Sequence, residues 1–520
     1  MAATILGGLG CALVLAGLRD SSPPPIIVIG LDGAAPHVVE DLWRQGELPH
    51  LRALADRGVF GPLRTNSQWS PVIWTTLATG VDEATHGISF FTVPTRDGEV
   101  PVTSNLRRVK AIWNLASESD RSVAVLGWWV TWPAEPVNGI VATDRMMTRL
   151  EGRVYPENVG AMVDEIREAG DTFGFQDLPA PPGENWEQIP QQDRLVANLT
   201  RRLVDRDFDL MMSYLRSIDL VSHRYWKYYH PARFGRLPGW ELERFGALVT
   251  DAYEAVDRAI GAIVEAAPED AHIFVISDHG FADRVPEVTQ VRLDLDRVLE
   301  AVGLLIPGAG GPDLPRSRLV THRTPVRTET KLVRVVGTAG PATPAEIRAV
   351  RAETEEKLFG VRYRNGRHVF QVRDARAEER ADGADFVVRV LTRSATNDIY
   401  WEGREIEGAV ESTFRFSGQH SAHTPGIFLA AGPGIDADAD LSRIDVRDVA
   451  PTVVFALGLE VPEAMEGRVL EHLFTEEFRD RVDLRYSRDA DFARRPGEEA
   501  LATDEDERLL EELRALGYLD

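Results

Sequence analysis

Short apolar runs alternate along this chain with longer stretches in which apolar residues recur at helical spacing. Continuous apolar runs of this length are typical of strands that are buried on both faces, and they lie at residues 26–31, 122–127, 210–215, 273–277 and 426–432. Helical spacing predicts helices within residues 36–57, 70–79, 109–117, 191–206 and 245–266. Strands that alternate with helices favour an α/β fold with a largely parallel sheet.

The pattern changes between residues 291 and 410. Residues 331–336 and 385–391 alternate like exposed strands, and a helix is predicted between them at residues 344–358. We therefore expect an α/β core with an inserted α+β cap. The expected division is a core of residues 24–290 and 411–475, a cap of residues 291–410 and a charged C-terminal tail of residues 476–520. Within that tail, residues 509–519 form an amphipathic segment that packs back or meets a partner.

Residues 66–80 present a hydroxyl group at the start of a predicted helix. Ser70 is a good N-cap residue, Pro71 suits the first helical position, and Trp74 and Leu77 follow at helical spacing. The free N–H groups and the positive end of the helix dipole would hold a phosphate in front of the Ser70 oxygen. The alternative interpretation is that Ser-Pro only starts a helix.

Carboxylate and imidazole groups follow three of the predicted strands, and one more histidine lies shortly before a fourth. They are Asp32, the pair Asp219 and His223, the pair Asp278 and His279, and His420, for which His423 is the competing choice. In an open α/β sheet, ligands gather beyond the carboxyl ends of the strands. We therefore expect Asp32, Asp219 and Asp278 to converge.

The ordered set of motifs resembles the alkaline phosphatase superfamily, and within it the type I phosphodiesterase/nucleotide pyrophosphatase branch. The resemblance covers residues 24–290 and 411–470 and rests on Leu31-Asp32-Gly33, Ser70 ten residues before Gly80, His86-Gly87-Ile88, Asp219-x-x-x-His223, Asp278-His279-Gly280 and Gly418-x-His420. It implies an alkaline phosphatase-like three-layer α/β/α sandwich. As a set, these motifs are far more specific than any one of them.

The resemblance also implies a function and its residues. Asp219, His223 and His420 would hold one zinc ion, Asp32, Asp278 and His279 would hold the other, and Ser70 would bridge toward both as the nucleophile. Nitrogen and carboxylate ligands suit zinc, and two metals suit phosphoryl transfer. The implied activity is hydrolysis of small phosphate esters through a covalent phospho-Ser70 intermediate.

Two departures from the family pattern leave the ester class open. No Asn lies between Ser70 and Gly80, where this branch commonly places a donor to the phosphate, and Ile73 occupies the region. Losing such a donor costs about 3 kcal/mol of transition-state stabilisation. Ser70 also stands where the nucleotide pyrophosphatases commonly have Thr, so diester and monoester preference both remain open.

Several rival functions fit the same motifs. A sulfatase is disfavoured, because Pro71 directly follows Ser70 and Trp74 stands where Arg would be needed. A phosphonate hydrolase, a transferase of phospho-headgroups and a non-catalytic binding module stay open. His86 is expected to be structural, since it lies beyond the helix that Ser70 opens. The tryptophans at 128, 129 and 132 either pack or line a pocket.

Composition narrows the class of partner. The chain has 520 residues, 27% of them charged, and a net charge of −24. That charge argues against nucleic acid, whose binding needs clustered Lys and Arg. The oligomeric state is left open.

The N-terminus predicts export. Residues 2–18 are uncharged and mostly apolar, which is typical of a signal peptide or a short membrane anchor, so residues 1–22 are assigned to it. A basic segment before the apolar run is missing, and the cytoplasm remains the alternative location. Cys11 is the only cysteine, so no intrachain disulfide forms.

Overall fold

The central element of the computed structural model is an eight-stranded sheet. The model describes residues 23–515 except 96–97, 169–172, 176–177, 179–187, 309–310, 314, 323–329, 339, 382, 392–395, 397, 489–491 and 498. The strand order is β2 (Gly58–Leu63), β21 (Gly426–Ala431), β9 (His272–Ser277), β1 (Ile26–Leu31), β8 (Leu210–Leu215), β5 (Val123–Leu126), β6 (Gly139–Ala142) and β7 (Val154–Tyr155). The five strands from β9 to β6 are parallel, and β2, β21 and β7 pair antiparallel at the two edges.

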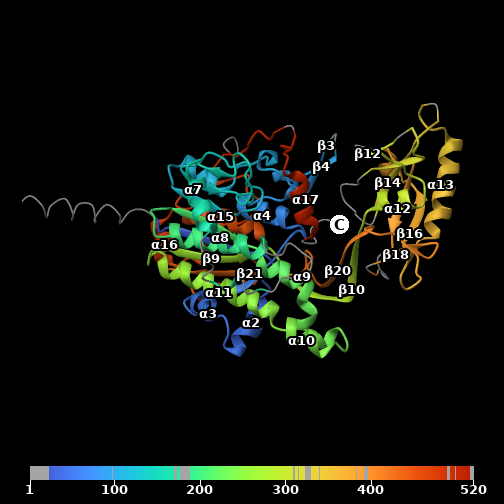
Figure 1. Cartoon of the computed structure of the whole chain (residues 1–520). Helices are drawn as coiled ribbons and strands as arrows, with labels where there is room; N and C mark the ends of the chain where they lie inside the picture. Colours follow the sequence, from blue (N-terminus) through green and yellow to red (C-terminus); the bar gives the residue numbers. More distant parts are fainter. Residues whose placement is uncertain are drawn as a thin grey trace, which may run out of the picture.

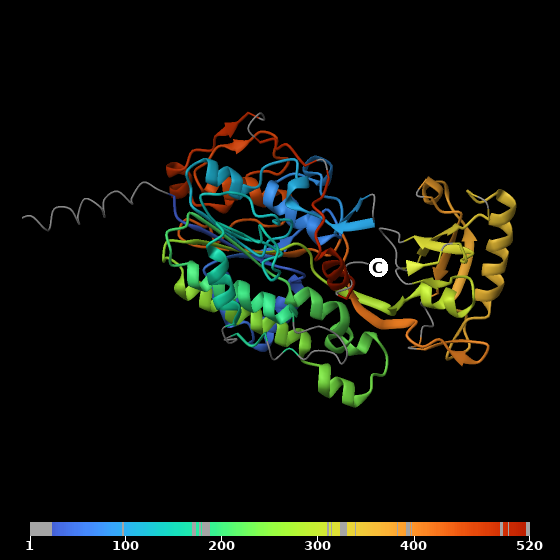
Figure 2. The same ribbon diagram turned by 45° about the horizontal axis from the view of Figure 1, so that its top comes forward.

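Helices cover both faces of this sheet, as Figures 1 and 2 show. One face carries α2 (Pro36–Gln45), α3 (Pro49–Ala55), α7 (Val159–Glu168), α8 (Gln188–Leu203), α9 (Ser217–Tyr229) and α11 (Leu248–Ala266). The other carries α4 (Ser70–Thr79), α6 (Ile112–Glu118) and α15 (Val446–Ala456). Along β1, Ile27 and Ile29 join the first helix layer and Ile26 and Val28 the second. The predicted three-layer α/β/α sandwich is confirmed.

Several helix starts differ from the prediction: α6 begins at Ile112 rather than at 109 and α8 at Gln188 rather than at 191, and α4 and α11 differ as well. Helix α4 begins at Ser70 itself, with Trp69 as the N-cap. Proline fits the first turn at either of its early positions, so Pro71 fixes the start only to within one residue. The helix predicted over residues 245–266 begins at Leu248, because α10 (Gly239–Phe245) ends at its C-cap Gly246.

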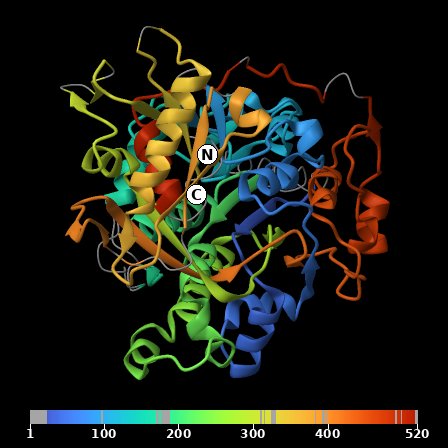
Figure 3. The same cartoon turned by 90° about the vertical axis from the view of Figure 1, so that its right-hand side faces the viewer.

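An outer unit is inserted between the core strands β9 and β21 and is joined to the core by an antiparallel pair, β10 (Ala282–Leu293) and β20 (Val410–Gln419). Its main sheet has the order β13 (Leu319–His322), β14 (Thr330–Val335), β17 (Phe386–Val390) and β16 (Phe370–Asp374), with α12 (Leu295–Ala301) and α13 (Pro344–Phe359) beside it. Its apolar side chains form a cluster of their own. The unit lies at the right of Figure 1 and in front of the core in Figure 3.

The C-terminal part of the chain returns to the core. Helix α16 (Glu476–Arg481) packs through Phe478, and α17 (Asp506–Ala515) buries Leu510 and Leu513 in the same apolar cluster as α8. The described part of the amphipathic segment 509–519 therefore packs back onto the core, at the edge that faces the outer unit in Figure 2.

The predicted signal peptide or anchor at residues 1–22 and Cys11 lie outside the described residues. Among the residues that the structure describes, none of the helices combines the length and the hydropathy needed to cross a membrane.

Candidate active site

Three aspartates converge where neighbouring strands end. Asp32 directly follows β1, Asp278 directly follows β9, and Asp219 lies in the first turn of α9, just after β8. Because β9, β1 and β8 are adjacent in the sheet, their carboxyl ends bring the three side chains together. All three side chains are fully buried. We call these aspartates and the three histidines around them, His223, His279 and His420, the carboxylate–histidine cluster.

His279 lies at the centre of the three carboxylates. Its Nε2 atom is 3.3 Å from Asp278 Oδ2, 3.4 Å from Asp32 Oδ1 and 3.9 Å from Asp219 Oδ1. The imidazole itself is fully buried. One ring nitrogen therefore faces an oxygen of every aspartate in the cluster.

The other two histidines of the cluster, His223 and His420, lie close to each other and to Asp219. His223 Nε2 lies 3.4 Å from Asp219 Oδ1, His420 Nε2 lies 4.0 Å from it, and these two nitrogens are 3.2 Å apart. The His420 ring also stacks on that of His279, with centroids 3.6 Å apart. His423, the competing choice, is exposed and lies outside the groups of potential ligands found among the described residues.

The grouping differs in one respect from the expected division into two sets of three. Potential ligand atoms gather as Asp219, His223 and His420, and as Asp32, Asp219 and His279. Asp219 belongs to both groups, while Asp278 approaches through His279. Asp219 therefore stands between the two expected positions.

The carboxylates disfavour one another in their charged form. Burial, with Asp278 and Asp219 close by, raises the pKa of Asp32 well above its ordinary value. Burial also raises the pKa of Asp278 to about 6, although His279 lowers it. For Asp219 burial acts upward as well, but His223 and the other imidazoles hold its pKa below the ordinary value. Buried carboxylates at this spacing need added positive charge to be ionised together.

The donor atoms fit a metal ion. Asp32 Oδ1, Asp278 Oδ2 and His279 Nε2 are buried, and none of them has a hydrogen-bond partner among the described residues. Orphaned polar atoms of this kind are costly unless something satisfies them. Carboxylate oxygens and imidazole nitrogens are the ligands that zinc takes at catalytic sites.

Gly33 allows the Asp32 loop to approach α9. Its φ angle is +75°, and a Cβ atom there would lie 2.9 Å from the Cα atom of Asp219 and 2.7 Å from the Phe281 ring. Its N–H also donates to Asp278 Oδ1 over 3.3 Å. Only glycine offers both this backbone conformation and this closeness.

Ser70 lies one helical turn before a residue that packs beside Asp32. Trp74, four residues on and therefore on the same face of α4, contacts the ring of Tyr214 at 4.9 Å between centroids. The Ser70 hydroxyl is fully buried and has no hydrogen-bond partner among the described residues. The first turn of α4 thus carries a buried hydroxyl on the same helix face as Trp74, which contacts Tyr214.

The helix end offers fewer donors than expected. The N–H groups of Val72 and Ile73 both donate to the Trp69 carbonyl, and Pro71 has no N–H. These donors are lost to an anion because the helix starts one residue earlier than predicted. An anion in front of Ser70 would therefore gain mainly from the helix dipole.

A hydrogen-bonded chain behind Asp32 was missed by the sequence analysis. The Tyr214 hydroxyl donates to Asp32 Oδ2 over 2.5 Å, and Trp129 Nε1 donates to the Tyr214 oxygen over 2.8 Å. Burial and Asp32 raise the pKa of Tyr214 well above its ordinary value, so it stays a donor. The sequence gives no local signal for this chain of hydrogen bonds, because β8 also carries the polar Ser213.

The remaining candidates take structural positions. His86 is buried, accepts from the N–H of Ile88 and contacts the Thr76 hydroxyl at 3.2 Å, which agrees with the structural role expected for it. Trp128 packs against Trp74 and donates to its carbonyl. Trp128 therefore packs, which is one of the two roles expected for these tryptophans. Trp129 instead donates a hydrogen bond to the Tyr214 oxygen.

Comparison with known proteins agrees with this architecture. Residues 26–385 match the family described as type I phosphodiesterase/nucleotide pyrophosphatase. Comparison with curated protein sequences yields no match.

Solved structures resemble the chain only remotely. Phosphonoacetate hydrolase from Sinorhizobium meliloti, in complex with phosphonoformate, is 14% identical over 84% of this chain and 96% of that one, with a TM-score of 0.44. Murine ectonucleotide pyrophosphatase/phosphodiesterase 5, in an inactive form with AMP, is 13% identical over 87% and 100%, also with a TM-score of 0.44. The human counterpart is 12% identical over the same shares, with a TM-score of 0.43.

The family match, together with the α/β/α core, identifies the class of protein as a phosphoric ester hydrolase. Buried carboxylates and histidines at the strand ends agree with the metal dependence of that class. The chain belongs to the type I phosphodiesterase/nucleotide pyrophosphatase family, within the alkaline phosphatase superfamily.

Proposed function

We propose that this chain hydrolyses small phosphate esters with two metal ions, most simply zinc, and with Ser70 as the nucleophile. The observation that carries the proposal is the buried carboxylate–histidine cluster, in which Asp32 Oδ1, Asp278 Oδ2 and His279 Nε2 have no hydrogen-bond partner among the described residues. The Ser70 hydroxyl is likewise buried without such a partner. A structural cluster would have satisfied these atoms with donors of its own.

The proposed ligands are those expected from the sequence. Asp219, His223 and His420 would hold one ion, and Asp32, Asp278 and His279 the other, with Asp219 near enough to serve both. Bound ions would neutralise the three carboxylates, lower the pKa of a coordinated hydroxyl and stabilise charge on the phosphoryl oxygens.

In the proposed reaction, Ser70 supplies the hydroxyl oxygen that attacks phosphorus. The Ser70 Oγ–P bond would form while the bond from phosphorus to the leaving oxygen breaks, and water would then cleave the Oγ–P bond. Tyr214 would hold Asp32 in place throughout through its hydrogen bond. The helix dipole of α4 would favour the negative phosphoryl group in front of Ser70.

A panel of substrates decides which class of ester the protein hydrolyses. The panel contains chromogenic forms of a phosphate diester, a phosphate monoester, a phosphonate ester and a sulfate ester. The family favours the diester, and phosphomonoesters and phosphonates are the alternatives. A transferase would release product only when an acceptor is supplied, and a binding module would hold metal or ligand without turnover.

Ser70→Ala is the direct test of the nucleophile. The variant should keep its metal and its melting temperature but lose turnover by several orders of magnitude. Thr79→Ala is the matched control, because it removes a buried hydroxyl from the last turn of the same helix, where Thr79 Oγ1 donates to the Thr75 carbonyl. Unchanged turnover in Ser70→Ala would overturn the assignment.

We also propose that the outer unit is a cap that shapes substrate choice, and that residues 1–22 direct export or anchoring. The outer unit is inserted between His279 and His420, so it emerges beside the cluster. N-terminal sequencing of the mature protein and fractionation of cells test the second proposal. A full-length cytoplasmic protein would contradict it.

A further inference from the structure

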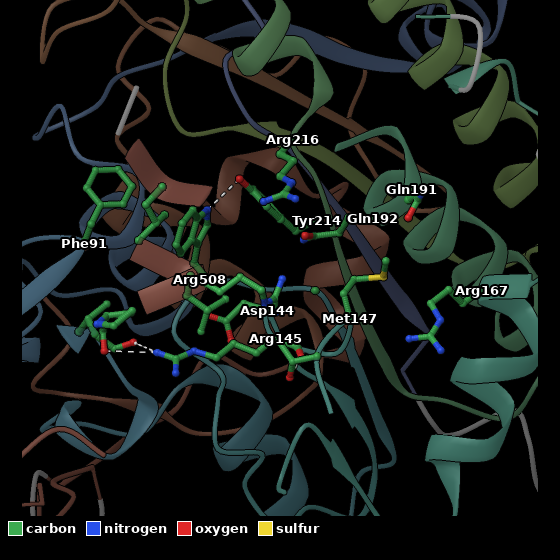
Figure 4. A pocket seen from close by; sticks show the side chains of 17 residues that line it. Phe91, Asp144, Arg145, Met147, Arg167, Gln191, Gln192, Tyr214, Arg216 and Arg508 are labelled. Carbon is green, nitrogen blue, oxygen red and sulfur yellow. Dashed lines mark hydrogen bonds between the residues drawn. The ribbon is translucent and has the colours of Figure 1, made fainter. Parts of the chain in front are cut away.

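A partly open cavity lies beside the cluster, between the ends of the core strands and the C-terminal helix. Its volume is about 350 Å³. Gly127 follows β5, Tyr214 belongs to β8, Asp144 follows β6, and Leu509 and Leu513 of α17 form the opposite wall. Figure 4 shows side chains from these separate segments around one space.

Arginines gather on this cavity in a strongly acidic protein. Arg145, Arg167, Arg216 and Arg508 line it, and Asp144 is the one acidic residue among its lining residues. The whole chain carries a net charge of −24. Positive groups outnumber negative ones among the lining side chains, although Arg145, Arg167 and Arg508 also pair with Asp506, Asp164 and Glu505. A partly apolar space with such a lining favours an anion.

The side chain of Arg145 is buried in the cavity wall and held there by several contacts. It is only 5% exposed, donates to the carbonyls of Pro101 and Val102 over 3.3 and 3.1 Å, and lies over the Trp132 ring at 4.3 Å. Its Nη1 atom has no hydrogen-bond partner among the described residues and is 3.7 Å from a carboxylate oxygen of Asp506. These contacts fix the guanidinium, whose Nη1 atom is held in a long ion pair with Asp506 and has no hydrogen-bond acceptor among the described residues.

Thr148, Gln191 and Gln192 add polar groups to the lining, and the rest of the wall is largely apolar. Phe91, Trp129, Met147 and Leu513 contribute carbon surface to the same space. A bare inorganic ion would leave this surface uncovered, whereas an organic anion would cover it and meet the arginines at once. The lining therefore selects for a charged molecule with an aromatic or aliphatic body.

We propose that this cavity binds a small organic anion that carries at least two negative charges on an apolar body. Its site is separate from the carboxylate–histidine cluster, with which it shares Tyr214 as a common wall. The proposal does not depend on hydrolysis at Ser70. Two sources supply such chemistry: the non-reacting part of an ester substrate, or an independent effector.

The test uses the full-length protein and benzene-1,3-disulfonate as the probe. Sulfonates are weak metal ligands, so this dianion reports on the arginines more than on the cluster. Isothermal titration should give saturable binding, and benzyl alcohol, a neutral aromatic molecule, should bind at least tenfold more weakly. Hydrogen exchange should show protection of α17, which contributes Arg508, Leu509 and Leu513.

Arg508→Gln is the variant and Arg44→Gln its matched control. Arg508 pairs with Glu505 and Arg44 with Asp41, each three residues earlier in the chain, but only Arg508 lines the cavity. Arg508→Gln should weaken the probe about tenfold, and Arg44→Gln should leave its affinity unchanged. Arg145→Lys keeps the positive charge but removes the planar guanidinium with its paired N–H donors. Its affinity for the probe tests the buried position independently.

Kinetics of diester turnover separate the two sources. A probe that raises KM without changing kcat competes with part of the substrate, and one that changes kcat acts as an effector; both results support the site. Equal affinity in the protein and in Arg508→Gln, equal binding of benzyl alcohol, or protection elsewhere than α17 would overturn it. If the protein binds the probe but turns over no ester, the cavity stands and the proposed function fails.

Discussion

Tyr214 and Asp32 are joined by a hydrogen bond of 2.5 Å from the phenolic hydroxyl to Oδ2. The bond spans two neighbouring strands, because Tyr214 pairs with Gly30 in the register of β1 and β8. Gly30 has no side chain, and a Cβ atom there would lie 2.6 Å from the Trp74 ring. Strand register and one missing side chain together hold the first carboxylate of the cluster.

Replacing Tyr214 by Phe should weaken metal binding. The change leaves Asp32 Oδ2 without its donor, and losing a partner of this kind lowers metal affinity or activity 10–100-fold, as a rough expectation. Competition with a chromophoric chelator measures the affinity. Tyr228→Phe is the control, because its hydroxyl donates to a carboxylate, Glu241, on the helical layer away from Asp32. Equal metal affinity in both variants would contradict the role given to Tyr214.

Replacing Gly33 by Ala should reduce turnover while the chain still folds. The new Cβ atom would press on Asp219 and Phe281, at a backbone angle that also strains alanine. Gly46→Ala is the matched control: its φ angle is +87°, but nothing lies within 4 Å of the added atom. Both variants should lose about 1 kcal/mol of stability from the strained backbone. Only Gly33→Ala should lose activity, and full activity in it would refute the argument.

Asp219→Ala should remove more metal than His223→Ala does. Asp219 lies within reach of both groups of potential ligands, whereas His223 belongs to one. Elemental analysis of the purified proteins should give the most metal in the parent, less in His223→Ala and the least in Asp219→Ala. Equal metal content in the two variants would show that Asp219 serves one ion alone.

Stability should fall in acid partly through His86. Burial, together with Arg107 and Arg108, lowers its pKa to about 3, and its Nδ1 atom accepts from Ile88 and so cannot carry a proton there. The unfolded chain binds this proton near pH 6.5, while the folded chain resists it. The contribution is therefore complete above pH 6.5 and is lost as pH falls toward 3, by about 1.4 kcal/mol per pH unit.

Urea unfolding of His86→Gln at pH 7, 6 and 5 checks this. The parent should be the more stable at pH 7, and its advantage should shrink as pH falls. His423→Gln, which removes an exposed imidazole, is the control. Parallel stability curves for the parent and His86→Gln would exclude the effect.

The strands and most of the helices were predictable because their signals are local. Runs such as Ile26–Leu31 are apolar on both faces, and parallel sheets require this. The order of strands then brings Asp32, Asp219 and Asp278 together without further information. The start of α4 was wrong by one residue, since a proline fits more than one position in a first turn.

Two features depend on tertiary structure and left no local signal. Tyr214 reaches Asp32 only through the register of β8 on β1, which no pattern within either strand specifies. The cavity collects Arg145, Arg216 and Arg508 from segments far apart in the chain. Such convergence follows from how α17 folds back, and an amphipathic pattern predicts that a helix packs but not where.

The two strands that carry the outer unit are anchored at the histidines of the cluster. Strand β10 begins at Ala282, shortly after His279, and β20 ends at Gln419, immediately before His420. Their ladder pairs Ala282 with Gln419 at its foot, and the two imidazole rings stack just beyond it. The pair of strands thus joins the outer unit directly to two histidines of the cluster. The foot of the outer unit and the two stacked imidazoles therefore share one continuous piece of backbone on each strand.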